Sequence, residues 1–393
     1  MHGVRPHARA STSAGIGTPR PAAGRRILAG SMLVVAVLLS GCATFPDDGA
    51  RAWREKAEGQ GELGGPPALA SPEPPPEAPQ PAQQPRAGGP SAPQPCVDPD
   101  PQVVATCLNP IGAVATLPAG DEALVGERTT GRVLRVKKGS PPQLVTTVPV
   151  DPEAGLTGLV LSPGYAEDRL VYALAGTPSD VRVLRLAPGE PPKPVLTGIP
   201  RGSGGALAVD PDGSLLVATG AGAGPLAGKI LKIDTLGRPA PGNPDPASPV
   251  LSSGLTAPGG LCVDPVTRTI WATDRTPTRD VLYRVTPGAL GTPAWTWPDK
   301  PGVAGCTVLP GTVAVAERGA GALFMLRPGE NGSFTGDPKP VLTGTYGALA
   351  AVTLAPDGLI WLGTANKDGG KPGATDDRVI RIQPPSGGAG SAA

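Results

Sequence analysis

Apolar residues recur along the chain in short blocks that are separated by turn residues. Six segments share one order: an apolar strand, a turn usually built on Pro, Asp or Gly, and a second apolar strand. They recur roughly every 45 to 55 residues, and self-similarity at such a period indicates a repeat architecture. The first residues of the six segments are Ile111, Thr157, Gly205, Gly259, Ala304 and Ala350.

A third strand follows each pair and mostly alternates apolar with polar or basic residues, as half-exposed strands do. These third strands are expected at 132–136, 182–186, 229–233, 281–285, 322–326 and 378–382. A fourth follows in five cases, at 142–148, 192–198, 248–254, 293–298 and 338–344. Four strands at a period of about 45 residues describe a propeller blade, and no helix-period segment supports a helical solenoid. We therefore expect an all-β, six-bladed β-propeller.

The sixth repeat has no fourth strand after Ile382, because only a Gly/Ser-rich tail remains. The segment 101–107, PQVVATC, resembles the fourth-strand pattern and lies at the other end of the repeats. We expect this N-terminal strand to complete the last blade and close the ring. Closure removes the free strand edges that an open array would expose.

The repeat also indicates which cysteines should lie close together. Cys262 and Cys306 hold matching positions in the first strands of neighbouring repeats, and these inner strands would lie side by side at the central channel. Cys96 and Cys107 would pin the closing strand. Three pairings are possible, of which we favour Cys96–Cys107 and Cys262–Cys306, and free buried thiols are the alternative.

The N-terminal part of the chain is typical of an exported lipoprotein. A pair of arginines precedes the apolar run 27–39, which is too short to span a bilayer of about 30 Å and is typical of a signal sequence. The run closes on LSGC, which resembles the bacterial lipobox and implies cleavage before Cys42 and lipid on its sulfur. An ordinary signal with a chance cysteine, and twin-arginine export through Arg25 and Arg26, remain as alternatives.

Four regions follow from these features. Proline lacks the N–H that helices and sheet ladders need, so the proline-rich run before Cys96 is expected to be a linker. We expect a lipoprotein signal peptide at 1–41, lipidated Cys42 with a Pro/Ala-rich disordered linker at 42–95, the propeller at 96–383 and a disordered tail at 384–393. Such a protein would be a monomer, anchored by lipid at the outer face of the bacterial cytoplasmic membrane.

Charge and histidine content exclude several classes of function. The net charge is +1 and no basic cluster stands out beyond the N-terminus, which argues against nucleic acid as a partner. The histidines are His2 and His7, both before the signal sequence, so no serine has a histidine partner for a catalytic triad. Aspartates near Pro and Gly, such as Asp212 and Asp357, are explained by turn chemistry, and we predict no metal site.

Three segments resemble the PQQ-dependent glucose/sorbosone dehydrogenases, which are six-bladed propellers. EALVGERTTGRVLRV from Glu122 is similar to that family's first-blade signature, and DPEAGLTGLVLSPGYAEDRLVYAL from Asp151 to its second. GKILKIDTLGRPAPGNP from Gly228 is similar to the exit from its third blade. The resemblance covers about 103–383, nearly the whole globular part, and implies the same fold.

The residues that carry the family's chemistry do not match. The resemblance implies a His-x-Gly-Gly-Arg motif before the third blade, whose histidine takes the sugar's proton while hydride passes to PQQ. Gly202 holds the histidine position here and Ala206 the arginine position. Where the family has Arg-Asn, Arg-x-Arg and a calcium-binding Glu-His-Gly, this chain has Thr256-Ala257, Ala348 with Ala350, and Thr273-Asp274-Arg275. Glu153 survives, as does Arg318, at a position where the family has a basic PQQ contact.

A pocket is still expected at one face of the ring. Three second strands end in an acidic–basic pair, and loops before first strands should reach the same face. Functionally these residues suit a small polar ligand such as a sugar or peptidoglycan fragment, and the simpler interpretation is salt bridges between blade tips. Adjacent strand residues point to opposite sides, so each pair can direct only one member inwards. The candidate pocket residues are Glu153, Arg201, Asp274, Arg275, Glu317, Arg318 and Tyr346.

Two functions from different classes follow. The first is a non-catalytic module that binds a ligand or partner, such as a sugar, an envelope glycan or an envelope protein, and it needs no cofactor. The second is a PQQ- and calcium-dependent aldose dehydrogenase with an altered active site, in which Asp274, Glu153 or Glu317 would have to act as the base.

Overall fold

The computed structural model describes residues 96–329, 333–336 and 338–385. The expected signal sequence, Cys42, the linker and residues 386–393 of the tail lie outside the described residues, so the expectations for them stay predictions. Within the described ranges, no helix has the length and apolar character needed to cross a bilayer.

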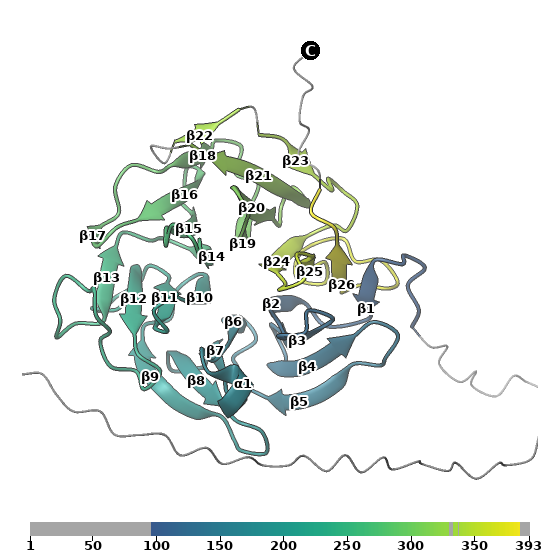
Figure 1. Cartoon of the computed structure of the whole chain (residues 1–393), viewed down its shortest axis with the longest axis horizontal. Coiled ribbons are helices and arrows are strands. Elements are labelled where there is room, and N and C mark those ends of the chain that lie inside the picture. The colour runs from purple at the N-terminus through teal and green to yellow at the C-terminus, as the bar shows by residue number, and fades with distance from the viewer. Residues whose placement is uncertain (1–95, 330–332, 337, 386–393) are drawn as a thin grey trace, which may run out of the picture. The chain divides into compact units, whose positions relative to one another are not determined.

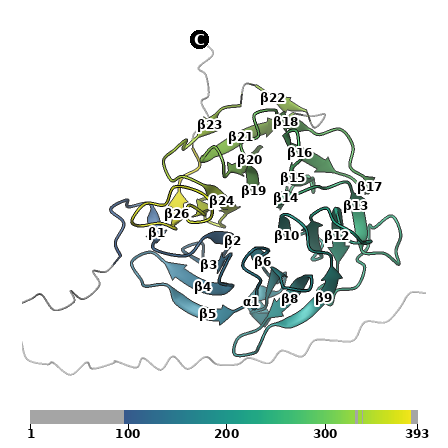
Figure 2. The same cartoon turned by 180° about the vertical axis from the view of Figure 1, so that it is seen from behind.

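Six β-sheets surround a central axis, and the prediction of an all-β, six-bladed propeller is confirmed (Figures 1 and 2). In blade 1 the strands are β2 (Ile111–Thr116), β3 (Glu122–Glu127), β4 (Arg132–Lys137) and β5 (Gln143–Thr147). Blade 2 comprises β6 (Leu156–Leu161), α1 (Tyr165–Asp168), β7 (Val171–Gly176), β8 (Val181–Leu186) and β9 (Lys193–Ile199). Blade 3 comprises β10 (Gly205–Val209), β11 (Leu215–Thr219), β12 (Lys229–Ile233) and β13 (Val250–Ser253).

The second half of the ring follows the same plan. Blade 4 comprises β14 (Pro258–Val263), β15 (Ile270–Arg275), β16 (Asp280–Val285) and β18 (Trp295–Trp297). Blade 5 comprises β19 (Val303–Leu309), β20 (Thr312–Glu317), β21 (Ala322–Pro328), β22 (Phe334–Thr335) and β23 (Pro340–Val341). Blade 6 comprises β24 (Leu349–Leu354), β25 (Ile360–Thr364), β26 (Val379–Ile382) and β1 (Val103–Ala105).

Two outer edges differ from the predicted pattern. The fourth strand expected at 338–344 is reduced to β23, because the long strand β21 shares its outer edge between β22 and β23. The short strand β17 (Gly288–Ala289), which comes from the connection between β16 and β18, adds to β13 of blade 3 in parallel. Both additions lie far from the axis and leave the inner three strands of each blade unchanged.

The ring closes as the sequence predicts. β1 pairs antiparallel with β26, with Val103 opposite Ile380. The backbone N–H of Arg381 also donates to the carbonyl of Gln102 at 2.9 Å. The last blade therefore consists of three strands from the C-terminal end and one from the N-terminal end, which satisfies the outer edge of β26.

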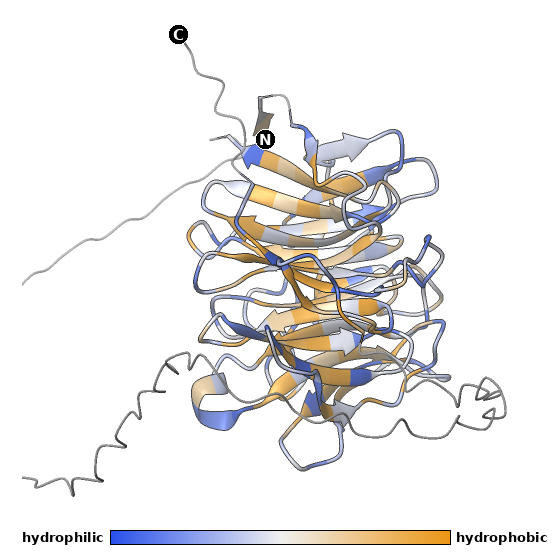
Figure 3. Cartoon of the chain, turned by 90° about the vertical axis from the view of Figure 1, so that its right-hand side faces the viewer, coloured by the Kyte–Doolittle hydropathy of each residue, from blue (hydrophilic) through white to orange (hydrophobic). Residues whose placement is uncertain are grey.

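The hydrophobic core lies between the faces of neighbouring blades. One cluster, for example, packs Tyr172 and Leu174 of blade 2 against Leu207, Val217 and Leu231 of blade 3. Figure 3 shows apolar stretches along the strands and polar residues concentrated in loops. Sheets that bury both faces need apolar residues at consecutive positions, which explains the fully buried second strands such as β7 and β11.

Both predicted disulfides are present. Cys262 and Cys306 join the inner strands β14 and β19, with Cα atoms 5.6 Å apart. Cys96 and Cys107 flank β1, with Cα atoms 6.3 Å apart. Five of the chain's twelve aromatic residues gather beside the bridge between Cys262 and Cys306, where they make mutual ring contacts between blades 4 and 5. They are Trp271, Trp295, Trp297, Phe324 and Phe334.

Candidate functional site

The first strands begin, and the second strands end, at one face of the ring, which we call the mouth. The register of the inner strands shows this directly, because Ile111 pairs with Glu127 and Val303 pairs with Glu317. The turns that join first to second strands lie at the opposite face. Strand ends from different blades therefore bring polar residues that are distant in sequence to one opening.

The three acidic–basic pairs are split between the interior and the mouth. The carboxylates of Glu127, Asp274 and Glu317 are at most 3% exposed. The arginines that follow them line a cavity of about 590 Å³ at the mouth, together with residues from the starts of the first strands. The arginines of this cavity are Arg128, Arg201, Arg275 and Arg318.

Two of the buried carboxylates hold the loops that precede the first strands. Glu127 accepts hydrogen bonds from the backbone and side-chain amides of Asn109, both at 3.0 Å. Asp274 accepts from the backbone N–H groups of Thr256 and Ala257, at distances down to 2.6 Å. Burial is the largest influence on the Asp274 carboxyl and raises its pKa. These groups fix the backbone around the mouth and are not among the residues that line the cavity.

Glu317 is the exception among the three. Its Oε1 is buried and has no hydrogen-bond partner among the described residues. Burial, followed by the negative charges of Asp299 and Asp280, raises the pKa of Glu317 to about 7. Glu317 is 3% exposed and does not line the cavity.

The arginines of the mouth differ in how they are neutralised. Asp368 lies 3.2 Å from Arg128 and 3.0 Å from Arg318. Arg201 pairs with Asp151 at 3.2 Å. Guanidinium groups are matched in shape and charge to carboxylates and other oxyanions, so the cavity is suited to an anionic ligand.

Of the four arginines that line the mouth, Arg275 makes no ion pair with a described residue, whereas the other three do. Its Nη1 donates to the carbonyl of Val303 at 2.8 Å. Burial is the largest cause that lowers the pKa of Arg275, and the charges of Arg318 and Arg128 act in the same direction, whereas the negative charges of Asp280 and Asp274 oppose it. Three guanidinium groups therefore lie close enough to influence one another at the mouth.

The structure places the remaining predicted residues as follows. Glu153 lines the cavity, and its backbone carbonyl accepts from Arg128. Tyr346 does not line it: the ring is 2% exposed and its hydroxyl donates to Oε1 of Gln102 at 2.6 Å. Burial raises the pKa of Tyr346 to about 12. Tyr346 therefore packs where the N-terminal segment joins blade 6.

Gly202 lines the cavity, at the position where the family resemblance implies a histidine. A Cβ atom at Gly202 would lie 2.5 Å from the carbonyl oxygen of Ala221 and 2.9 Å from the backbone of Gly220. Contacts under 3.0 Å with backbone require the chain to move, so this position has no room for a side chain. Ala206, at the position of the family's arginine, is buried in β10.

Sequence reasoning missed Asp368 and Asp151. Both lie in loops rich in Gly, Pro and Asp, where an aspartate is explained as a turn residue. The signal that could have found Asp368 is topological. It lies in the connection from β25 to β26, which begins where a second strand ends and therefore opens at the mouth.

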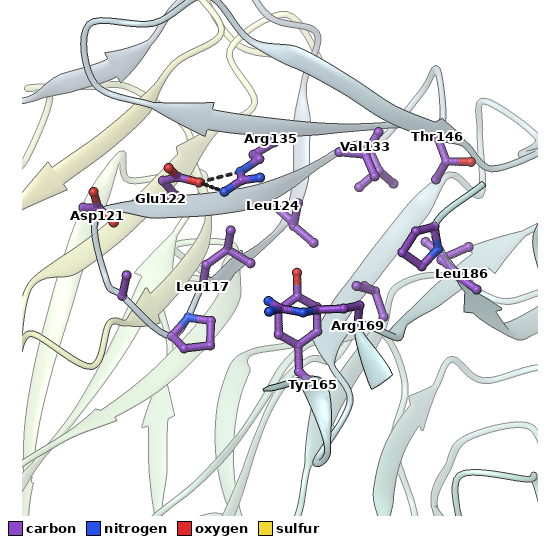
Figure 4. Close-up of a pocket in the computed structure, with 16 residues that line it drawn as sticks. Leu117, Asp121, Glu122, Leu124, Val133, Arg135, Thr146, Tyr165, Arg169 and Leu186 are labelled. Atoms are coloured by element: carbon purple, nitrogen blue, oxygen red, sulfur yellow. Dashed lines mark hydrogen bonds and ion pairs between the residues drawn. The ribbon is translucent and has the colours of Figure 1, made fainter. Parts of the chain in front are cut away.

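A second cavity, of about 580 Å³, lies between blades 1 and 2. Its walls include the turn that joins β2 to β3, so this inter-blade groove opens at the face opposite the mouth. Figure 4 shows Tyr165 and Arg169 facing an apolar wall that includes Leu124 and Val133. The guanidinium carbon of Arg169 lies 5.6 Å from the centroid of the Tyr165 ring. Within the described ranges, no group of three or more His, Cys, Asp or Glu side chains could hold a metal ion at either cavity.

Comparisons with known proteins agree with this geometry. The family model described as Glucose / Sorbosone dehydrogenase matches residues 109–301. The PQQ-bound aldose sugar dehydrogenase of Streptomyces coelicolor is 33% identical with a TM-score of 0.67, over 72% of this chain and 96% of that one. A structure described as a putative glucose dehydrogenase, from Thermus thermophilus, is 30% identical with a TM-score of 0.66, over 71% of this chain and 98% of that one.

A more distant structure supports the fold alone. The soluble aldose sugar dehydrogenase of Escherichia coli is 18% identical with a TM-score of 0.62, over 72% of this chain and 99% of that one. No curated protein sequence matches the chain. The extent of the two nearer matches, together with the six blades and the second-blade motif at Glu153, shows that the chain belongs to the glucose/sorbosone dehydrogenase family.

Proposed function

We propose that the propeller is a non-catalytic binding module whose mouth holds a small anionic ligand. The observation that supports this proposal is the composition of the mouth: four arginines line the cavity, and the chain has no histidine beyond His7. Arginine binds carboxylates strongly but stays protonated, so it cannot accept a proton from a sugar hydroxyl at neutral pH.

The carboxylates near the mouth are poorly placed to replace the missing base. A general base must lie within hydrogen-bond reach of the proton that it removes. Asp274 is occupied by backbone N–H groups, and Glu317 is buried and does not line the cavity. Glu153 is the glutamate that lines the cavity, and it is exposed.

The alternative is a PQQ-dependent aldose dehydrogenase, and the arginine set also favours it. PQQ carries three carboxylates and supplies a hydride acceptor when bound. Arg128, Arg275 and Arg318 are the residues that would hold those carboxylates, which fits the donor chemistry of the mouth. The same residues leave the sugar's proton without a histidine acceptor, so binding without turnover is the expected outcome even with PQQ in place.

The experiment that separates the two functions measures binding and turnover on one preparation. The purified protein is titrated with PQQ plus calcium, and with neutral and acidic sugars, by calorimetry and by the shift in melting temperature. Reduction of an artificial dye is then followed with a panel of aldoses. Binding of acidic sugars or PQQ without dye reduction supports the binding module, and PQQ-dependent dye reduction with any aldose establishes the enzyme instead.

We further propose that the module is displayed as a monomer at the outer face of the cytoplasmic membrane, tethered through lipid on Cys42. The lipobox-like LSGC sequence and the long proline-rich segment after it support this part of the proposal. Replacing Cys42 with Ser should move the protein from the membrane fraction to the soluble fraction. If the C42S protein stays with the membrane, the lipid anchor is refuted.

A further inference from the structure

Asp368 places one carboxylate oxygen between two arginines of the mouth. Its Oδ2 lies 3.2 Å from Nη1 of Arg128 and 3.0 Å from Nη2 of Arg318. Arg318 also donates to the backbone carbonyl of Asp368. The two arginines follow the second strands of blades 1 and 5, so one oxygen from blade 6 joins guanidinium groups on both neighbouring blades. A carboxylate from a ligand could make the same contacts.

The segment that carries Asp368 is fixed at its base and glycine-rich beyond it. At the base, the carboxylate of Asp377 accepts from the backbone N–H of Lys367 at 3.2 Å, and Nζ of Lys367 donates to the carbonyl of Leu108 at 2.7 Å. Beyond Asp368, Gly369 has a φ of +81°, in a region that glycine occupies without strain. Backbone hydrogen bonds run from Asp368 to the carbonyl of Ala365 at 3.2 Å and from Gly370 to the carbonyl of Asn366 at 3.0 Å, and a displaced tip would release them while the base stays in place.

The mouth holds a further arginine that makes no ion pair with Asp368. Arg275 lines the same cavity and has no carboxylate partner among the described residues. The charges of Arg128 and Arg318 disfavour the protonated form of Arg275, while those of Asp280 and Asp274, which do not line the cavity, favour it. An anion that entered between the three groups would relieve their mutual repulsion, which a single aspartate shared by two of them does only in part.

We propose that Asp368 occupies the anion position of the mouth in the free protein, and that a sugar acid binds by replacing it with its own carboxylate. This inference rests on the proposed function and adds the class of ligand and the group that the ligand displaces. Besides the arginines, the cavity is lined by the hydroxyl groups of Thr157 and Ser203 and by Glu153, which are suited to the hydroxyls of a sugar. A volume of about 590 Å³ accommodates a ligand of one or two sugar rings.

The strength of the Asp368 ion pairs sets how much this residue should weaken the binding of a sugar acid. The side chain of Asp368 is 30% exposed, and ion pairs that are partly open to solvent contribute little net stability. A tethered competitor acts at an effective concentration on the order of millimolar, so it weakens the apparent affinity of a ligand that must displace it. Removing it should strengthen binding by about tenfold.

The test compares the full protein with two matched variants that each lose one negative charge. Asp368→Asn removes the internal carboxylate, whereas Asp357→Asn removes a carboxylate that pairs with Arg381 in a turn at the opposite face. Galacturonate is titrated into each by calorimetry at constant ionic strength, with galactose as the neutral control. We expect D368N to bind galacturonate about tenfold more tightly than the wild type, and D357N to bind as the wild type does.

The outcomes distinguish this inference from the function on which it rests. If galacturonate binds the wild type and D368N equally, or binds D357N as tightly as D368N, the displacement of Asp368 is refuted while binding at the mouth stands. If galacturonate binds neither protein, both proposals are refuted. A second measurement does not depend on a variant: hydrogen exchange at residues 368–371 should accelerate when galacturonate binds the wild type, and unchanged exchange during binding would also refute the displacement.

Discussion

The cavity at the mouth and the inter-blade groove have nearly equal volumes, about 590 and 580 Å³, and opposite chemistry. The mouth is built from strand ends on several blades, and its charged side chains face solvent across a polar opening. The groove is built from the faces of two blades, and its wall continues their hydrophobic core. Leu124, Val133 and Val171 are buried members of that core and also line the groove. Cavity size alone therefore does not distinguish the two cavities, whereas the origin of their lining residues does.

The difference predicts that substitutions at the two places separate affinity from stability. The arginines of the mouth are not part of the hydrophobic clusters, so changing them should alter ligand binding more than folding. The apolar side chains of the groove belong to the core, so changing them should lower the stability of the fold and leave ligand binding at the mouth intact.

The largest effect is expected at the mouth. Replacing both Arg275 and Arg318 with Met removes two charge-assisted contacts with a ligand carboxylate, each worth about 2 kcal/mol, while keeping much of the apolar volume. Galacturonate affinity should fall about a thousandfold, measured by calorimetry. The melting temperature should stay within about 2 °C of the wild type, and a large decrease would show that these arginines are structural.

The next effect concerns the buried carboxylate behind the mouth. The pKa of Glu317 rises from 4.5 to about 7 on folding, so the folded protein binds the proton more tightly than the unfolded chain does. Its contribution to the free energy of unfolding is full below pH 4.5 and falls as the pH rises to about 7, by about 3 kcal/mol at most.

Denaturant unfolding of the wild type and of Glu317→Gln across pH 4 to 8 checks this expectation. Glutamine stays neutral, so the difference between the two proteins should grow in favour of the variant as the pH rises. A difference that does not change with pH would mean that Glu317 stays ionised in the folded protein.

At the groove, Leu124→Ala should lower the free energy of unfolding by about 2.5 kcal/mol, because Leu124 is 4% exposed within the core that blades 1 and 2 share. Denaturant unfolding measures the loss, and galacturonate affinity should match that of the wild type. Weaker galacturonate binding by this variant would show that the two cavities are coupled, and would contradict the separation of affinity from stability.

The smallest effect is expected at Gly202, which is compared with its neighbour Ser203 within the mouth. Gly202→His introduces the residue type of the family's base, but its Cβ would press on the carbonyl of Ala221. We expect a loss of about 2 kcal/mol in stability and no dye reduction with glucose, with or without PQQ. Ser203→His, at the exposed neighbouring position, is the control. If G202H is as stable as S203H and turns over glucose, the mouth has kept the geometry of an active site.

The fold could be predicted because it depends on local patterns that repeat. The six strand pairs, the closing segment at 101–107 and the matched positions of Cys262 and Cys306 all follow from one period, and the structure confirms them. The short strand β17 was not predicted, because its pairing with blade 3 depends on where a connection of blade 4 lies in space.

The mouth was harder to predict, because its partners come from loops without a repeat. The arginines were found from the ends of the second strands, but Asp368 reaches them from a connection of irregular length. Tyr346 was expected near the mouth on the same reasoning, and its loop instead turns the ring towards Gln102 at the closing strand. Strand periodicity specifies on which face of the sheet a strand residue lies, but it does not specify the path of a loop.

The disulfide between Cys96 and Cys107 has a mechanical consequence for a tethered protein. Tension along the N-terminal segment enters the propeller at Cys96 and passes through the covalent bridge to Cys107, which lies beyond β1 in the chain. Residues 97–106, including the strand that closes the ring, are bypassed by this path. If the chain is anchored as proposed, the hydrogen bonds between β1 and β26 would be spared the load, and the ring would stay closed for as long as the bridge is oxidised.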